Sequence, residues 1–128
     1  MKWCVWRHST APSGYITRLH IIKTPWFAIC VHHLHSFDHE PDMHDHPVSF
    51  LSIILRGDYI EVLPDGQYNR YHNRRWLNLI MATDRHRIIW VNAKTTTLCF
   101  MGPKVRKWGY HTPDGWIYWK DYNKMYYQ

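Results

Sequence analysis

Short apolar segments separated by turn-forming residues run along the whole chain. The segments between the turns are rich in β-branched and aromatic residues, which favour extended strands. The predicted strands cover residues 15–22, 26–34, 50–55, 59–63, 87–91 and 95–101. No segment of ten or more residues carries the periodicity of an amphipathic helix. The pattern therefore predicts an all-β fold with little helix, either a sandwich or a barrel.

Length and composition fit one domain spanning residues 1–128. A chain of 128 residues can bury a core, and its 45% hydrophobic and 16% aromatic residues exclude a disordered protein. No apolar run approaches the roughly 18 residues of a membrane span, and the first residues lack the apolar core of a signal peptide. We therefore expect a cytoplasmic protein without a membrane partner. The aromatic segment from about residue 103 to 128 is expected to pack on the domain.

Charge and cysteine content narrow the function classes only slightly. The three cysteines are far apart and odd in number, so neither a disulfide framework nor a zinc knuckle is indicated. A net charge of +6 suits a nucleic acid, a small anionic molecule or solubility alone. The cluster from Arg70 to Trp76 mixes basic and aromatic residues, as single-strand binders do. Such clusters are more often solvated surface, so nucleic acid is not the favoured partner.

Two histidines two residues apart, His44 and His46, precede a predicted buried strand. Side chains at such positions share one strand face and lie roughly 6.5 Å apart along the backbone. Random placement of the 11 histidines would give about one such pair, and His33 and His35 form another. Only the pair His44 and His46 is followed by a proline, Pro47, which fixes the backbone, and then by an apolar run. This context makes His44 and His46 candidate ligands of a single ion.

A third ligand must come from another segment, because one strand face cannot surround an ion. His86 is the best candidate, since it follows an acidic turn and opens the predicted strand 87–91. Glu61 shares a strand face with Tyr59 and is a candidate fourth ligand, although a surface position suits it equally well. His32 is a weaker candidate. Imidazole ligands predict a divalent transition metal such as Fe, Mn, Ni or Zn.

The motif around these histidines resembles that of the cupin superfamily of small jelly-roll barrels. The first cupin motif runs H-x-H-x(3,4)-E-x(6)-G, and the spacing from His46 to Gly57 matches it. Phe50 stands where the family has a glutamate that usually binds metal. His86 matches the histidine of the second motif, although the proline and glycine of that motif are absent. The resemblance implies a jelly-roll β-barrel with either a three-histidine site or a substitute carboxylate.

A closer resemblance covers most of the chain. It is carried by runs that include His44-Asp45-His46-Pro47, Gly57-Asp58-Tyr59-Ile60-Glu61, Asp84-Arg85-His86-Arg87 and Gly102-Pro103-Lys104-Val105-Arg106-Lys107-Trp108-Gly109. These runs are similar to small uncharacterised single-domain cupin proteins of phage and bacterial genomes. The function of those relatives is unassigned, so the resemblance implies a fold and a site rather than an activity. Because cupins often pair through barrel edges, it also implies a homodimer, located in the host cytoplasm if a phage encodes it.

Other residues near the motif have structural interpretations. Asp45 points away from the two histidines along a strand, so we expect it to hold a neighbouring loop or to orient an imidazole. Trp108, Tyr110, Trp116 and Trp119 are expected to pack rather than to form a substrate cage.

Three hypotheses on function remain open at this stage. The first is a metal-dependent enzyme with dioxygenase-like or isomerase or lyase chemistry on a small polar or anionic substrate, with Tyr59 and Glu61 in proton transfer. The second is a metal-free enzyme resembling sugar-nucleotide epimerase cupins, in which Arg56, Arg85 and Arg87 hold a diphosphate. There the histidines act as buried hydrogen-bonded groups or in proton transfer. The third is a binding or assembly protein without catalysis.

Overall fold

Strands make up nearly all the regular structure of the chain. The computed structural model describes residues 2–8, 16–38, 40–92 and 94–126. In this part of the chain the strands are β1 (Lys2–His8), β2 (Ile16–Lys23), β3 (Ala28–Leu34), β4 (Met43–His44), β5 (Phe50–Arg56), β6 (Tyr59–Val62), β7 (Tyr68–Tyr71), β8 (Leu77–Ile80), β9 (Arg87–Val91), β10 (Thr95–Met101), β11 (Gly109–Thr112) and β12 (Gly115–Tyr118). One helix, α1 (Trp119–Tyr126), follows them. The predicted all-β class is confirmed.

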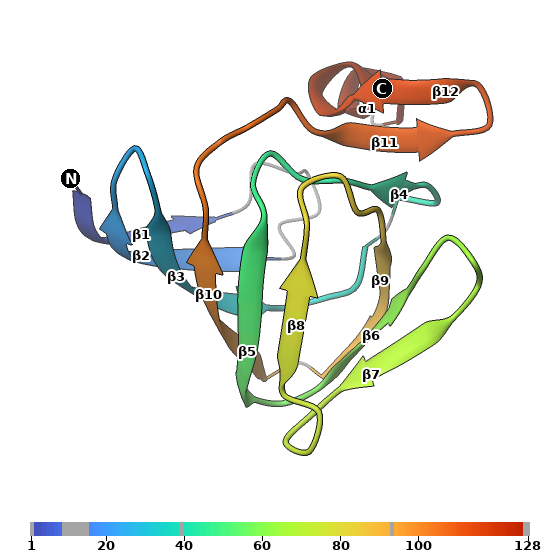
Figure 1. Ribbon diagram of the computed structural model, residues 1–128. Helices are drawn as coiled ribbons and strands as arrows, with labels where there is room; N and C mark the ends of the chain where they lie inside the picture. The colour runs from blue at the N-terminus through green and yellow to red at the C-terminus, as the bar shows by residue number, and fades with distance from the viewer. Residues whose placement is uncertain (1, 9–15, 39, 93, 127–128) are drawn as a thin grey trace.

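The strands form three antiparallel sheets that together make the barrel. The largest has the order β1-β2-β3-β10-β5-β8, and a smaller one has the order β7-β6-β9. The third, β12-β11-β4, lies with helix α1 at one end of the molecule (Figure 1). Because β10 pairs with both β3 and β5, strands far apart in sequence lie side by side, as in a jelly roll.

The apolar core lies toward the turn between β5 and β6. Ile16 and Leu34, which are partners across β2 and β3, pack there with Tyr59 and Tyr71. The rings of Tyr59 and Tyr71 stack with their centroids 5.2 Å apart. Because each of these side chains is less than a tenth exposed, the end of the barrel near this turn is where apolar burial stabilises the fold.

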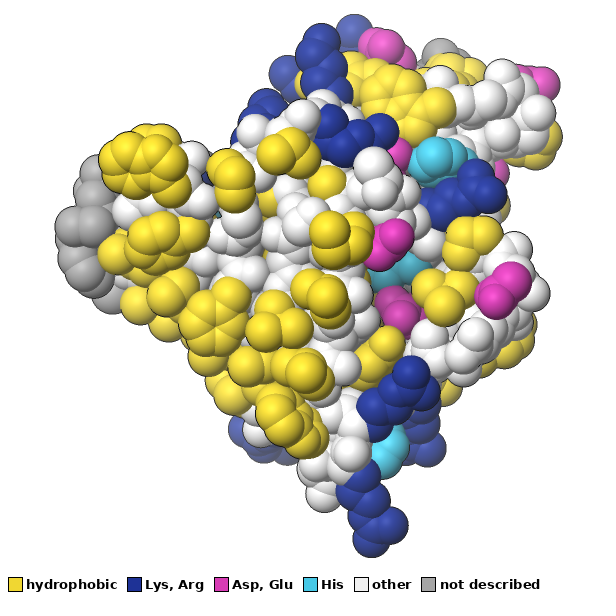
Figure 2. Space-filling model, in the orientation of Figure 1, with side chains coloured by type: hydrophobic (Ala, Val, Ile, Leu, Met, Phe, Trp, Pro, Cys, Tyr) yellow, Lys and Arg dark blue, Asp and Glu magenta, His cyan; other side chains and the backbone are white. Residues whose placement is uncertain are grey.

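The outer face of the large sheet is apolar where β5, β8 and β10 lie together. Leu77 and Leu79 on β8 are 47% and 65% exposed, and Leu55 on β5 and Phe100 on β10 are exposed beside them. The space-filling view shows a broad hydrophobic area over the large sheet (Figure 2). A contiguous apolar face of this kind is typical of a protein interface.

Asp45 ties the C-terminal hairpin to the rest of the domain. Its carboxylate is 1% exposed and accepts hydrogen bonds from the backbone N–H of Gly109 (2.8 Å), Nε2 of His111 (2.9 Å) and Nε1 of Trp116 (2.9 Å). An ion pair with Arg106, 2.8 Å long, completes the set. Burial would raise the pKa of Asp45, but the bonds from Arg106, Gly109 and His111 hold it below its usual value. The expectation that Asp45 holds a neighbouring segment is confirmed.

Aromatic stacking packs helix α1 against β11. Tyr122 on the helix stacks on Tyr110 with centroids 3.9 Å apart, and Trp119 stacks on Trp108 at 5.5 Å. The hydroxyl of Tyr122 also donates to Oδ2 of Asp42 (3.0 Å). No helix in the described residues has the length and apolarity that crossing a membrane requires.

Gly57 allows β10 to lie directly against the turn between β5 and β6. Its φ is +84°, and a Cβ added there would lie 2.5 Å from Oγ1 of Thr95 and 2.6 Å from the Cα of Thr95. The Thr95 hydroxyl joins the turn by donating to the backbone oxygen of Asp58 (2.8 Å) and accepting from its N–H (3.1 Å). Gly66 has a similar φ of +85° but faces open space.

The substitution Gly57→Ala is therefore expected to lower the free energy of unfolding by about 3 kcal/mol, through backbone strain and a clash with β10. Gly66→Ala is the matched control and is expected to cost about 1 kcal/mol, through strain alone. Urea unfolding followed by tryptophan fluorescence measures both values. Equal losses in the two variants would contradict the tight approach of Thr95.

Candidate metal centre

Three histidine side chains from two distant segments meet inside the barrel. One ring nitrogen from each of His44, His46 and His86 lies within 4.8 Å of the other two. The ring centroids are 4.9 to 5.0 Å apart, so the rings form a nearly equilateral triangle. In the described residues no other group of His, Cys, Asp or Glu meets the same distance condition. The three histidines nominated from the sequence therefore come together.

Backbone hydrogen bonds hold the two segments in register. The N–H of His44 donates to the oxygen of His86 (3.0 Å), and the N–H of His86 donates back to the oxygen of His44 (3.1 Å). The N–H of His46 donates to the oxygen of Ala82 (3.1 Å). Because these bonds fix the backbones, the imidazoles are positioned by the sheet rather than by flexible loops.

Glu61 lies behind His86, next to the ring nitrogen Nδ1. Its carboxylate, on β6, accepts from Nδ1 of His86 (2.7 Å) and from the hydroxyl of Tyr71 (3.0 Å). Burial would raise the pKa of Glu61, but the His86 and Tyr71 hydrogen bonds hold it below its usual value. A carboxylate on Nδ1 fixes the tautomer of His86 and leaves its Nε2 lone pair for an ion. The group of three nitrogens does not include Glu61.

Asp38 has a similar place behind His44. Its Oδ2 lies 3.7 Å from Nδ1 of His44 and accepts from the backbone N–H of Ile88 (2.8 Å). The N–H of Asp38 donates to the oxygen of Ile88 (2.8 Å). Asp38 was not predicted from the sequence, because its position in a loop matches no motif. Its hydrogen bonds to Ile88 on β9 are what place its carboxylate near His44.

Phe50, at the position of the cupin glutamate, contacts a histidine of the triad. Its ring packs edge-on against His46 with centroids 5.1 Å apart. A phenyl ring offers no ligand atom, so this position supports His46 by packing. The carboxylates of the site instead lie behind the rings, on Nδ1 of His86 and near Nδ1 of His44.

The environment keeps two of these imidazoles neutral. Burial and the neighbouring His86 together lower the pKa of His44 to about 4, although the carboxylate of Asp38 has the opposite effect. Burial and the two neighbouring histidines lower the pKa of His46 as well. Since only the neutral ring has a lone pair to donate, these shifts favour the metal-binding form.

The donor set fits a divalent transition metal. Nδ1 of His46 is buried and has no hydrogen-bond partner within the described part of the chain. A buried nitrogen without a partner is costly unless something binds it. Three neutral imidazoles suit several first-row divalent metals, so the donor set identifies the class of ion and not the element.

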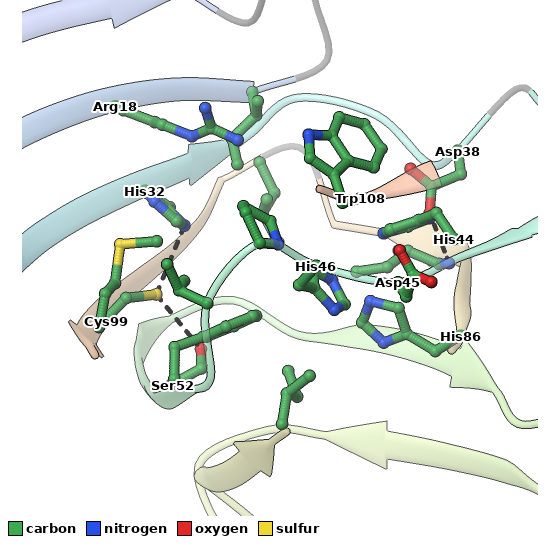
Figure 3. Close-up of a pocket in the computed structure, with 18 of the residues that line it drawn as sticks. Arg18, His32, Asp38, His44, Asp45, His46, Ser52, His86, Cys99 and Trp108 are labelled. Atoms are coloured by element: carbon green, nitrogen blue, oxygen red, sulfur yellow. Dashed lines mark hydrogen bonds and ion pairs between the residues drawn. The ribbon is translucent and has the colours of Figure 1, made fainter. Parts of the chain in front are cut away.

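The triad opens into a cavity of about 410 Å³. The inner faces of β2, β3, β5 and β10 form part of its wall, and Trp108, Tyr110 and Trp119 cover it from the C-terminal segment. The expected packing role of these aromatic residues is therefore incomplete, because three of them also border the cavity. Figure 3 shows His44 and His86 on one side, and Arg18, His32 and Cys99 on the other.

The other nominated residues have different positions relative to the triad. Tyr59 borders the cavity, and its hydroxyl accepts from Nδ2 of Asn78 (3.1 Å). Burial raises the pKa of Tyr59, so the phenol stays protonated. His32 borders the cavity but does not join the three nitrogens.

The diphosphate pocket expected around Arg56, Arg85 and Arg87 does not form at this cavity, because none of these residues lines it. Arg87 is used structurally, donating through Nε to the backbone oxygen of Glu40 (2.8 Å). The arginine that does line the cavity is Arg18 on β2, which the sequence analysis did not nominate.

Comparison with known proteins rests on structure alone, since no family model and no curated protein sequence matches the chain. The DMSP lyase DddQ from Ruegeria pomeroyi DSS-3 superposes with a TM-score of 0.65 at 13% identity, over 88% of this chain and 63% of that one. A cupin-2 domain from Rhodospirillum rubrum gives a TM-score of 0.65 at 14% identity, over 90% and 81%. Streptomyces PAC13 with uridine gives 0.62 at 7% identity, over 92% and 90%.

At such low identities the superpositions establish the fold and not the chemistry. They agree with the all-β architecture and its antiparallel sheets. The similarity to phage proteins in particular stays a prediction. The chain has the fold of the cupin superfamily.

Proposed function

We propose that this protein is a metal-dependent enzyme that acts on a small polar or anionic molecule. The observation that carries the proposal is the convergence of the three imidazoles on one wall of a cavity inside the barrel. His44, His46 and His86 would hold a divalent ion, which supplies Lewis acidity and open coordination positions for substrate or dioxygen. The reaction class is dioxygenase-like or a metal-dependent isomerisation or elimination.

The residues of the chain have distinct roles in this proposal. Glu61 acts through His86, since its carboxylate is on Nδ1 and holds the ring toward the site. Tyr59 is the nominated proton donor, because its buried phenol stays protonated at the cavity wall. The C-terminal aromatic residues exclude water from the cavity, which strengthens electrostatic interactions inside it.

The neighbours in structure space favour a small substrate over a nucleic acid. PAC13 was solved with uridine, and DddQ is named as a lyase of DMSP, a small molecule. The basic and aromatic cluster proposed as a nucleic-acid surface lies outside the cavity. In it Arg70 pairs with Asp58, and Arg75 lies 5.1 Å over the Tyr71 ring. Both contacts are explained by folding alone.

Metal analysis tests the proposal directly. Protein purified without an affinity tag is expected to hold one equivalent of a divalent transition metal, and the double substitution His44→Ala and His46→Ala is expected to abolish the loading. His35→Ala is the matched control, because His35 is exposed and bonded to Thr17 (2.6 Å) away from the site. Elemental analysis after dialysis gives the stoichiometry. Equal, substoichiometric metal in wild type and in the double variant would exclude the metal-dependent function.

The role of Glu61 has its own test. Glu61→Gln is expected to weaken metal affinity by about 10-fold, because the amide orients His86 less well than the carboxylate does. The absorption spectrum of the Co²⁺ form is expected to keep the same coordination number, since Glu61 acts behind the ring. A change in coordination number would instead make Glu61 a direct ligand, as the sequence also allowed.

We also propose that two copies of the chain pair through the apolar face of the large sheet. The exposed side chains of Leu55, Leu77, Leu79 and Phe100 form a surface of the kind that homodimers bury. Leu79→Glu is expected to shift the molecular mass measured by light scattering from two chains to one, while Val105→Glu, an exposed residue after β10, leaves it unchanged. A wild-type monomer at micromolar concentration would contradict the proposal.

A further inference from the structure

The inner face of the large sheet is polar where it borders the cavity. Cross-strand partners in antiparallel strands point to the same side, so the register gives rows of side chains across the face. One row is His20, Cys30, Cys99, Ser52 and Asn78, and the next begins with Arg18, His32 and Thr97 and ends at the apolar Ile54. Barrel interiors that serve only as a packed core are apolar. Two polar rows therefore indicate a wall built to contact a polar ligand.

Arg18 is the unusual member of these rows. It shares a strand face with Ile16, which is buried in the core, and it borders the cavity, although its own side chain is exposed to solvent. All ten aspartates and glutamates of the chain lie within the described residues, and none of them pairs with Arg18. The two carboxylates that line the cavity, Asp38 and Asp45, are held by other partners.

His32, the cross-strand partner of Arg18, does not offset this charge. It is 8% exposed, and its pKa is lowered to about 3 by burial and by the charge of Arg18. Its Nδ1 lies 3.4 Å from Sγ of Cys99, and its Nε2 has no hydrogen-bond partner in the described part of the chain. The wall therefore combines a guanidinium without a counterion and a neutral imidazole with an unused nitrogen.

Positive charge would lie on two opposite walls of the cavity when an ion is bound. Three imidazole ligands bring no negative charge to a divalent ion, and Arg18 adds a positive charge on the opposite wall (Figure 3). A single planar guanidinium matches the two oxygens of a carboxylate, which it binds with two parallel hydrogen bonds. A phosphate dianion needs more than one cation at its binding site, and among the residues whose side chains the structure describes, from Ile16 onward, Arg18 is the only arginine or lysine lining this cavity.

We propose that Arg18 binds a carboxylate group of the substrate, on the wall of the cavity opposite His44, His46 and His86. The substrate is then a small carboxylic acid whose other polar end reaches the three histidines. This second half rests on the metal-dependent function proposed above, whereas the carboxylate subsite does not. The cavity volume of about 410 Å³ limits the substrate to a small molecule.

Binding of simple diacids tests the subsite without any assay of activity. The probes are succinate, glutarate and adipate with their uncharged diamides, observed by NMR on metal-free and on Zn²⁺-loaded protein. At least one diacid is expected to bind, whereas the corresponding uncharged diamide is expected not to bind. Arg18→Gln is expected to weaken the binding of that diacid by about 10- to 100-fold, as loss of a charge-assisted bidentate contact predicts. Arg18→Lys keeps the positive charge but lacks the paired N–H donors of the guanidinium. Its affinity for the diacid is therefore expected to lie between those of wild type and Arg18→Gln.

Two controls separate this inference from the metal site and from misfolding. Arg56→Gln removes an exposed arginine that does not line the cavity, and it is expected to leave diacid affinity within about twofold of wild type. Arg18→Gln is expected to keep the metal content and the melting temperature of wild type. Wild type without metal would overturn the proposed function alone, because the metal-free protein still reports on Arg18.

Four results would overturn the carboxylate subsite. The first is equal diacid binding by wild type and Arg18→Gln, and the second is binding of the diamides as tightly as the diacids. The third is tighter, Arg18-dependent binding of inorganic phosphate than of any diacid. Absence of diacid binding up to about 50 mM in both metal states has the same consequence.

Discussion

The pair of backbone hydrogen bonds between His44 and His86 is the contact on which the site depends. It joins the segment before β5 to the segment before β9, although 42 positions separate the two residues in the sequence. Without this contact His86 would be an isolated buried histidine, and the other two would form only half a ligand set. Because backbone groups make the connection, the geometry of the site is fixed by sheet register and not by side-chain packing.

The short segment around β4 uses its two sides for different purposes. His44 and His46 face the cavity, while Asp45 between them faces the C-terminal hairpin and accepts its hydrogen bonds. Because successive side chains of a strand point to opposite sides, this segment joins the three-histidine site to the C-terminal hairpin that covers it. Stacking of Trp119 on Trp108 then brings helix α1 to the cavity, so one aspartate and a few rings determine how the triad is closed from solvent.

The apolar core and the polar wall of the barrel adjoin each other, and Tyr59 belongs both to the core and to the cavity lining. Ile16, Leu34, Tyr59 and Tyr71 bury apolar surface toward the β5–β6 turn, whereas the adjoining rows of the large sheet are polar. A polar interior contributes less to folding than an apolar one, and it requires satisfied hydrogen bonds. Within the described part of the chain, Nε2 of His32 and Nδ1 of His46 are buried nitrogens without a hydrogen-bond partner, and both residues line the cavity.

Phe50 stands where the cupin motif has a glutamate, and this affects the charge of the centre. In this chain the carboxylates of Glu61 and Asp38 contact the histidines from behind, so the three candidate ligands are imidazoles, which bring no negative charge to an ion. An ion bound there would keep more of its positive charge than one bound by a carboxylate. This difference is consistent with an opposite wall that carries the unpaired Arg18, since both features select for a negatively charged ligand.

The amino-acid sequence by itself determined the strands and the three histidines. Alternating and β-branched segments between turn residues predicted β2, β3, β5, β6, β9 and β10, because periodicity and turn chemistry are local properties. The spacing of His44 and His46 and the position of His86 before a strand were also local signals. The short strands β4, β7 and β8 and the C-terminal hairpin were not specified, since pairing with distant partners forms them.

Only the tertiary structure decided that Glu61 lies behind His86, that Asp38 approaches His44 and that Arg18 faces the cavity. Each of these depends on which strands become neighbours and in what register, and the free energy that selects them comes from contacts between residues far apart in the chain.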